Sequence, residues 1–77
     1  MTIKERVLQL VAEETGRPLE FLSEDSRFDT LEMDSLDFLD LLCSVDAAFD
    51  ISIPEGIAPQ LVTIGGLIRA VEICKCP

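Results

Sequence analysis

The chain has 77 residues, of which 48% are hydrophobic but only 5% aromatic, and its formal net charge is −9. This length is enough for one hydrophobic core and too short for a separate catalytic lobe, so we expect a single domain over residues 1–77. The negative charge disfavours nucleic acid and anionic membranes as partners and favours proteins with basic surfaces.

The kinds of residue present also exclude several chemistries. The chain has no histidine, which removes Ser-His and Cys-His catalysis and most zinc sites, so we expect no catalytic residue and no metal. Its cysteines, Cys43, Cys74 and Cys76, have neither the number nor the spacing of a disulfide framework or a redox pair. Without a leader pattern or a membrane-spanning apolar run, the expected location is the cytoplasm.

The first predicted element is an amphipathic helix from about Ile3 to Thr15. Thr2 and Glu5 have the spacing of a capping box, and apolar residues follow at helical intervals. Gly16 provides a left-handed stop and Pro18 prevents continuation. The helix should therefore end just before Gly16.

Residues 17–33 show no sustained periodicity. Apolar side chains are scattered among acidic and hydroxyl residues, at Phe21, Leu22, Phe28 and Leu31. We predict a long ordered loop held in place by these side chains, with one short turn at about Leu19 to Leu22.

A second helix is predicted to begin with Asp34 as its N-cap and to end near Asp50. Asp37 stands at its third position, where the helix dipole favours a carboxylate. At 100° per residue, one arc of this helix suits the core, namely Phe38, Leu41, Leu42, Val45 and Phe49.

Leu39 and Cys43 widen the apolar arc of this helix into a sector that also holds Asp40, Asp46 and Ala47. The resulting surface is both apolar and acidic. It suits contact with another protein, and it equally suits a helix that its neighbours bury on two sides.

Beyond residue 50, the alternating Ile51 to Ile53 stretch is interpreted as a linker because no second strand could pair with it. A short helix is expected between Pro54 and Val62, since Pro59 is compatible only with a first turn.

Thr63 can cap a last helix, whose buried stripe comprises Ile64, Leu67, Ile68 and Val71. Gly65 and Gly66 have low helix propensity, so the start of this helix is expected to be the softest part of the molecule. Three substantial helices, one short helix and no strands predict an all-α fold, a small four-helix bundle.

Ser35 is the residue of greatest chemical interest. A serine at a helix start often serves only as a cap. Here Asp34 can take that role, which leaves the Ser35 hydroxyl free at the positive end of the helix dipole, where a phosphate ester is favoured.

Three segments in order resemble the acyl carrier protein family over essentially the whole chain: Asp34-Ser35-Leu36, the stretch from Phe49 to Pro54, and Thr63-Ile64. The resemblance implies a single acyl carrier domain that is not itself an enzyme. It implies that Ser35 carries 4'-phosphopantetheine, and that Asp34 is read by the phosphopantetheinyl transferase that installs it. The arm would hold acyl groups for fatty acid, lipid or polyketide synthesis.

The resemblance also implies a face for basic patches on acyl-loading and acyl-transferring enzymes. That face comprises Leu36, Asp37, Leu39, Asp40, Cys43 and Asp46. We expect a free-standing monomer, without membrane insertion. An aminoacyl or peptidyl carrier is an alternative, with Asp34 disfavouring the peptidyl kind, and an unmodified acidic helical adaptor is another.

The chain departs from the family pattern in two places. Glu32, followed by Met33, stands where most members have a glycine, and the loop over residues 28–31 looks one residue short. The stretch from Glu55 to Gln60 has one acid in place of an acidic run. Both differences suggest a specialised carrier.

Overall fold

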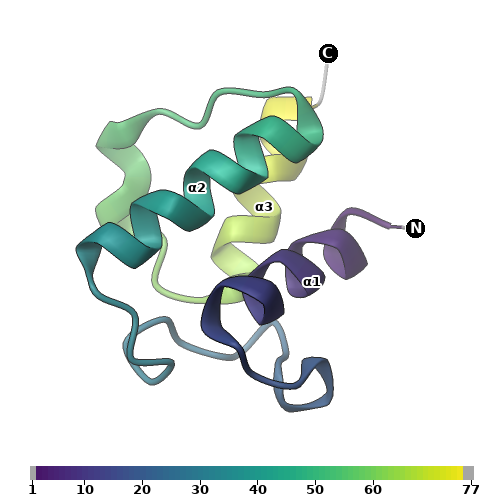
Figure 1. Ribbon diagram of the computed structural model, residues 1–77. Helices are drawn as coiled ribbons and strands as arrows, with labels where there is room; N and C mark the ends of the chain where they lie inside the picture. Colours follow the sequence, from purple (N-terminus) through teal and green to yellow (C-terminus); the bar gives the residue numbers. More distant parts are fainter. Residues whose placement is uncertain (1, 76–77) are drawn as a thin grey trace.

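The computed structural model describes residues 2–75, without the side chains of residues 55 and 58. Its elements are three α-helices and two 3₁₀ segments (Figure 1), which are α1 (Ile3–Thr15), η1 (Leu19–Phe21), α2 (Ser35–Phe49), η2 (Glu55–Gln60) and α3 (Ile64–Lys75). No strand occurs in the described part of the chain. The predicted all-α class is confirmed. The expected short helix is the six-residue 3₁₀ segment η2, but Pro59 is its fifth residue and does not lie in the first turn, as was expected.

Both ends of α1 follow the local sequence signals. The backbone N–H of Glu5 donates to Thr2 Oγ1 at 3.1 Å, and that hydroxyl donates to Glu5 Oε1 at 3.3 Å, as a capping box requires. Gly16 adopts a left-handed φ of 70° and donates its N–H to Ala12. The predicted bounds of this helix are confirmed.

The hydrophobic core lies where the three helices meet. In Figure 1, α3 lies behind α2, and α1 contacts both. Each helix contributes one buried stripe, and the linking segments add three more side chains. The core is formed by Val7, Leu10, Val11, Leu22, Phe28, Leu41, Leu42, Val45, Ile53, Ile64, Leu67, Ile68 and Val71.

The long loop between α1 and α2 is held by apolar anchors, as predicted, but not by all of those expected. Leu22 and Phe28 are buried, and Leu31 packs partly against the core. Phe21 was also expected to be an anchor, yet its side chain is 74% exposed. It lies on η1, where a short 3₁₀ turn directs neighbouring side chains to different sides and only Leu22 reaches the core.

Backbone hydrogen bonds tie this loop to the start of α3. Ile64 N–H donates to the Ser26 carbonyl at 2.9 Å, and Gly65 N–H donates to the Glu24 carbonyl at 2.8 Å. A Cβ on Gly65 would lie 3.0 Å from that Glu24 oxygen. Gly65 therefore permits the close approach of the loop, a packing role that its low helix propensity does not reveal.

Candidate functional site

At the start of α2, the residue that caps the helix is not the residue that has a free hydroxyl. Asp34 is extended, and its Oδ1 accepts the N–H of Asp37 at 2.9 Å. Ser35, the first residue of the helix, is exposed, and its hydroxyl makes no hydrogen bond within residues 2–75. The prediction that Asp34 caps the helix is confirmed, and the Ser35 hydroxyl is consequently available to a reagent from solvent.

A shallow apolar hollow of about 370 Å³ opens beside this hydroxyl, lined by Ser35, Phe38, Leu39 and Pro59. The Phe38 ring lies against Phe28, with ring centroids 5.0 Å apart and planes tilted by 59°, a favourable aromatic arrangement. Phe38 is thus held by the loop that precedes α2. The hollow offers an apolar surface to a flexible group attached at Ser35.

A larger hollow of about 620 Å³ lies between η2 and α3 and is lined in part by Ile57, Leu61 and Ile73. Ser35 does not contribute to it. We assign the smaller hollow to the site because it is the one that adjoins the free hydroxyl.

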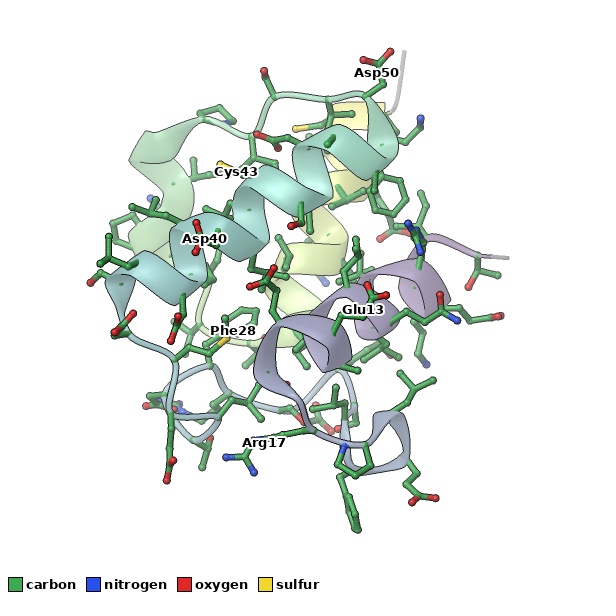
Figure 2. The ribbon with its side chains drawn as sticks, in the orientation of Figure 1. Glu13, Arg17, Phe28, Asp40, Cys43 and Asp50 are labelled. Atoms are coloured by element: carbon green, nitrogen blue, oxygen red, sulfur yellow. The ribbon has the colours of Figure 1, made fainter. Side chains whose placement is uncertain are left out.

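The face of α2 that follows Ser35 is apolar and acidic. Leu36 is 72% exposed and Leu39 is 44% exposed, and Asp37, Asp40 and Cys43 are exposed as well. Figure 2 labels Asp40 and Cys43 along this helix. A surface with exposed leucines between carboxylates suits a partner surface that has both apolar and basic side chains.

Asp46, expected on the same face, lies differently. It is half-buried, and its Oδ1 accepts the N–H of Ile53 at 3.1 Å. Its backbone carbonyl also accepts the N–H of Ile51 at 3.0 Å. Asp46 therefore fixes the linker after α2, a role that depends on a contact seven residues away.

The approach to Ser35 contains an unusual backbone conformation. Glu32 has a φ of 58°, and its N–H donates to the Asp29 carbonyl at 3.3 Å. Its neighbours Leu31 and Met33 both pack against the core. A left-handed conformation costs a non-glycine residue about 1–2 kcal/mol.

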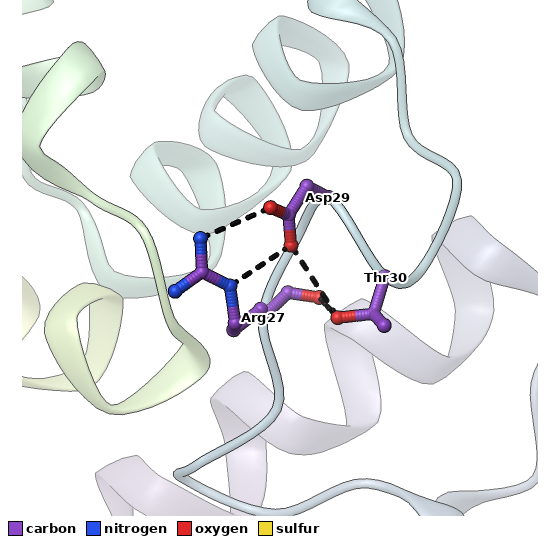
Figure 3. Close-up of polar contacts among 3 residues, drawn as sticks. All are labelled: Arg27, Asp29 and Thr30. Carbon is purple, nitrogen blue, oxygen red and sulfur yellow. Dashed lines mark hydrogen bonds and ion pairs between the residues drawn. The ribbon is translucent and has the colours of Figure 1, made fainter.

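The same loop contains a two-pronged ion pair that the sequence did not suggest (Figure 3). Arg27 Nε and a terminal guanidinium nitrogen donate to the two Asp29 oxygens at 3.1 and 3.0 Å. The hydrogen bond from Arg27 lowers the pKa of Asp29, and the same bond raises the pKa of Arg27. Both side chains are exposed, so the pair contributes little to the stability of the fold.

Comparison with known proteins identifies the family. The family model described as a phosphopantetheine attachment site matches residues 5–71. An acyl carrier protein of Streptococcus pneumoniae is 35% identical over 72 residues, covering 94% of this chain and 95% of the relative. The chain belongs to the acyl carrier protein family. The acyl carrier protein of Rickettsia massiliae is 30% identical over 71 residues, covering 91% and 83%.

Membership in the acyl carrier protein family confirms both the predicted resemblance and 4'-phosphopantetheine as the covalent group, because the matched family model describes its attachment site. The local structure fits such a group. An exposed hydroxyl stands at a helix N-terminus, where an anionic phosphodiester is favoured, and an apolar hollow lies beside it.

Residues 2–75 contain no cluster of side chains able to hold a metal ion. Cys43 and Cys74 are free thiols, and Cys76 lies outside the described residues. None of the helices described has the length and apolar character needed to cross a bilayer.

Proposed function

We propose that this protein is a non-catalytic acyl carrier that holds its cargo on 4'-phosphopantetheine attached to Ser35. The proposal is carried by one observation, the free and exposed hydroxyl of Ser35 at a helix start that Asp34 already caps. Family membership supports the nature of the attached group. The arm supplies a terminal thiol that holds the acyl group as a thioester.

The residues around Ser35 have distinct parts in this proposal. Ser35 Oγ gives its proton to a base of the transferase and bonds to the phosphorus of coenzyme A that carries the pantetheine arm, while the pyrophosphate P–O bond breaks and 3',5'-ADP leaves. The first N–H groups of α2 point toward the new phosphodiester and stabilise its charge. Phe38, Leu39 and Pro59 offer an apolar surface that shields the attached chain from water.

Partner enzymes are proposed to dock on the exposed face of α2. Asp34 lies beside the attachment point and is proposed to be read by the phosphopantetheinyl transferase. The remaining docking residues are proposed to be Leu36, Asp37, Leu39, Asp40, Cys43 and Asp46, with Asp46 also holding the linker. The enzymes that load and unload the arm are proposed to belong to fatty acid, lipid or polyketide synthesis, and to meet the carrier through basic patches.

At the level of the whole chain, we propose one carrier domain over residues 1–77 that acts as a cytoplasmic monomer. The acyl form is preferred over the aminoacyl form because the relatives described above are acyl carrier proteins.

The test is the intact mass of the protein after incubation with coenzyme A and a broad-specificity phosphopantetheinyl transferase. The wild type should gain one phosphopantetheinyl group, and Ser35→Ala should gain none. If the wild type gained nothing, the unmodified adaptor would replace the carrier. If Ser35→Ala gained as much as the wild type, the group would be attached at another residue and the assignment of Ser35 would be wrong.

A further inference from the structure

Glu32, three residues before Ser35, has a left-handed backbone conformation although it is not a glycine and caps no helix. Two non-glycine residues have a positive φ within residues 2–75, Glu32 and Asp50. Asp50 has a recognisable structural role, because it is the left-handed C-cap of α2 and donates its N–H to Asp46. Glu32 closes only a turn, which glycine would close without steric strain.

The side chain of Glu32 contributes nothing visible to the fold. It is exposed and makes no hydrogen bond or ion pair within residues 2–75. Arg27 is the single basic residue of the chain between residues 18 and 35, and its guanidinium is engaged by Asp29. The Glu32 carboxylate therefore remains available to a cation from another molecule.

The Glu32 carboxylate is close enough to Ser35 in the sequence to affect which enzyme can modify that serine. It lies three residues before the serine, on the short segment that leads into α2. Coenzyme A brings phosphate groups to this point, and a nearby carboxylate repels them unless a cation lies between. A transferase with a cationic side chain there would be favoured, and one without it would be disfavoured.

We propose that Glu32 is a specificity-determining residue that pairs with an arginine or lysine of the phosphopantetheinyl transferase acting at Ser35. The left-handed turn holds its carboxylate outside the fold, where this partner can reach it. The inference rests on the proposed attachment at Ser35 and adds to it the charge that the transferase must present.

The test compares the KM of the carrier for the phosphopantetheinyl transferase of its own cells, with intact mass as the readout of modification. Glu32→Gln keeps the size of the side chain and removes its charge. We expect its KM to rise about two- to fivefold at low salt, as for the loss of a partly exposed charge pair. Glu32→Asp should stay near the wild type. The difference should shrink as added salt screens the pair.

Glu13→Gln is the matched control, since Glu13 is an exposed acid on α1 and its loss changes the net charge equally (Figure 2). An unchanged or lower KM for Glu32→Gln, or an equal rise for Glu13→Gln, would overturn the role of Glu32. A wild type that is not modified, or a Ser35→Ala variant that is, would instead overturn the attachment site and this inference with it. Thermal unfolding of each variant separates these outcomes from misfolding.

Discussion

Ser35 shows how a neighbouring side chain decides what a residue can do. A serine at a helix start ordinarily accepts a hydrogen bond from the backbone two or three residues later. Here Asp34 accepts that bond from Asp37. The hydroxyl of Ser35 is consequently left without a structural task, which is the condition for a covalent attachment point.

Replacing Glu32 by glycine should stabilise the fold. The substitution removes a left-handed penalty of about 1–2 kcal/mol, but glycine loses about 0.5–1 kcal/mol more backbone entropy on folding. We therefore expect a net gain of up to about 1.5 kcal/mol in the free energy of unfolding. Denaturant unfolding measures it, and Glu32→Ala is the control that keeps the strain. A loss of stability in Glu32→Gly would contradict the assigned conformation.

The Arg27–Asp29 pair should be visible in the titration of one carboxyl group. Because Arg27 donates to the carboxylate, the pKa of Asp29 should lie below its ordinary value of 3.8. The pair thus favours the folded loop above the ordinary pKa and is lost as pH falls through the lowered one. NMR titration of Asp29 measures the shift, and Arg27→Gln should raise the Asp29 midpoint, leaving the smaller lowering that the hydrogen bonds from Thr30 cause. Equal midpoints in the two proteins would exclude the pair in solution.

At the scale of the elements, the linker after α2 depends on Asp46. Asp46→Ala leaves the N–H of the buried residue Ile53 without its acceptor, which should cost about 1–3 kcal/mol of unfolding free energy. Asp40→Ala is the matched control, because Asp40 is exposed on the same helix and should change stability by less than about 0.5 kcal/mol. Similar losses in both variants would argue against a structural role for Asp46.

The contact between the first loop and α3 depends on Gly65. A Cβ there would lie 3.0 Å from the backbone oxygen of Glu24, so Gly65→Ala should cost about 1–3 kcal/mol. At Gly66 the nearest atom is the Thr63 hydroxyl at 3.6 Å, so Gly66→Ala should be neutral or stabilising by up to about 1 kcal/mol. Thermal unfolding of the pair distinguishes packing from helix propensity. If Gly65→Ala were the more stable variant, the close approach would be wrong.

The parts of the fold that were predictable are those with local causes. The caps at Thr2 and Asp34, the stop at Gly16 and the buried stripe of α3 all follow from residues within one or two helical turns. The packing role of Gly65 depends on a loop about forty residues earlier in the chain, which no local pattern encodes.

Two features of the candidate site were predictable from the local sequence, and two were not. The availability of Ser35 follows from its neighbour Asp34, and α2 periodicity located the exposed face. The second role of Asp46 and the left-handed turn at Glu32 depend on how the linker and the preceding loop pack against the core. The exposure of Phe21 was missed for the same reason.

For the whole molecule, charge is the dominant surface property. The chain has 15 acidic and 6 basic residues, and within residues 2–75 only two ion pairs form, Lys4–Glu24 and Arg27–Asp29. Most carboxylates are therefore not offset inside the fold, and the field of the molecule attracts basic surfaces. The surface of this small fold combines the negative charge with a free hydroxyl at Ser35, which lies beside an apolar hollow. This combination suits a carrier that other enzymes recognise and modify.

The central claim is most directly tested by tandem mass spectrometry of the protein isolated from its own cells. The peptide that contains Ser35 should carry 4'-phosphopantetheine, with an acyl group on a fraction of the arms. A Ser35 peptide that is unmodified throughout, or an arm attached to a different residue, would contradict this account.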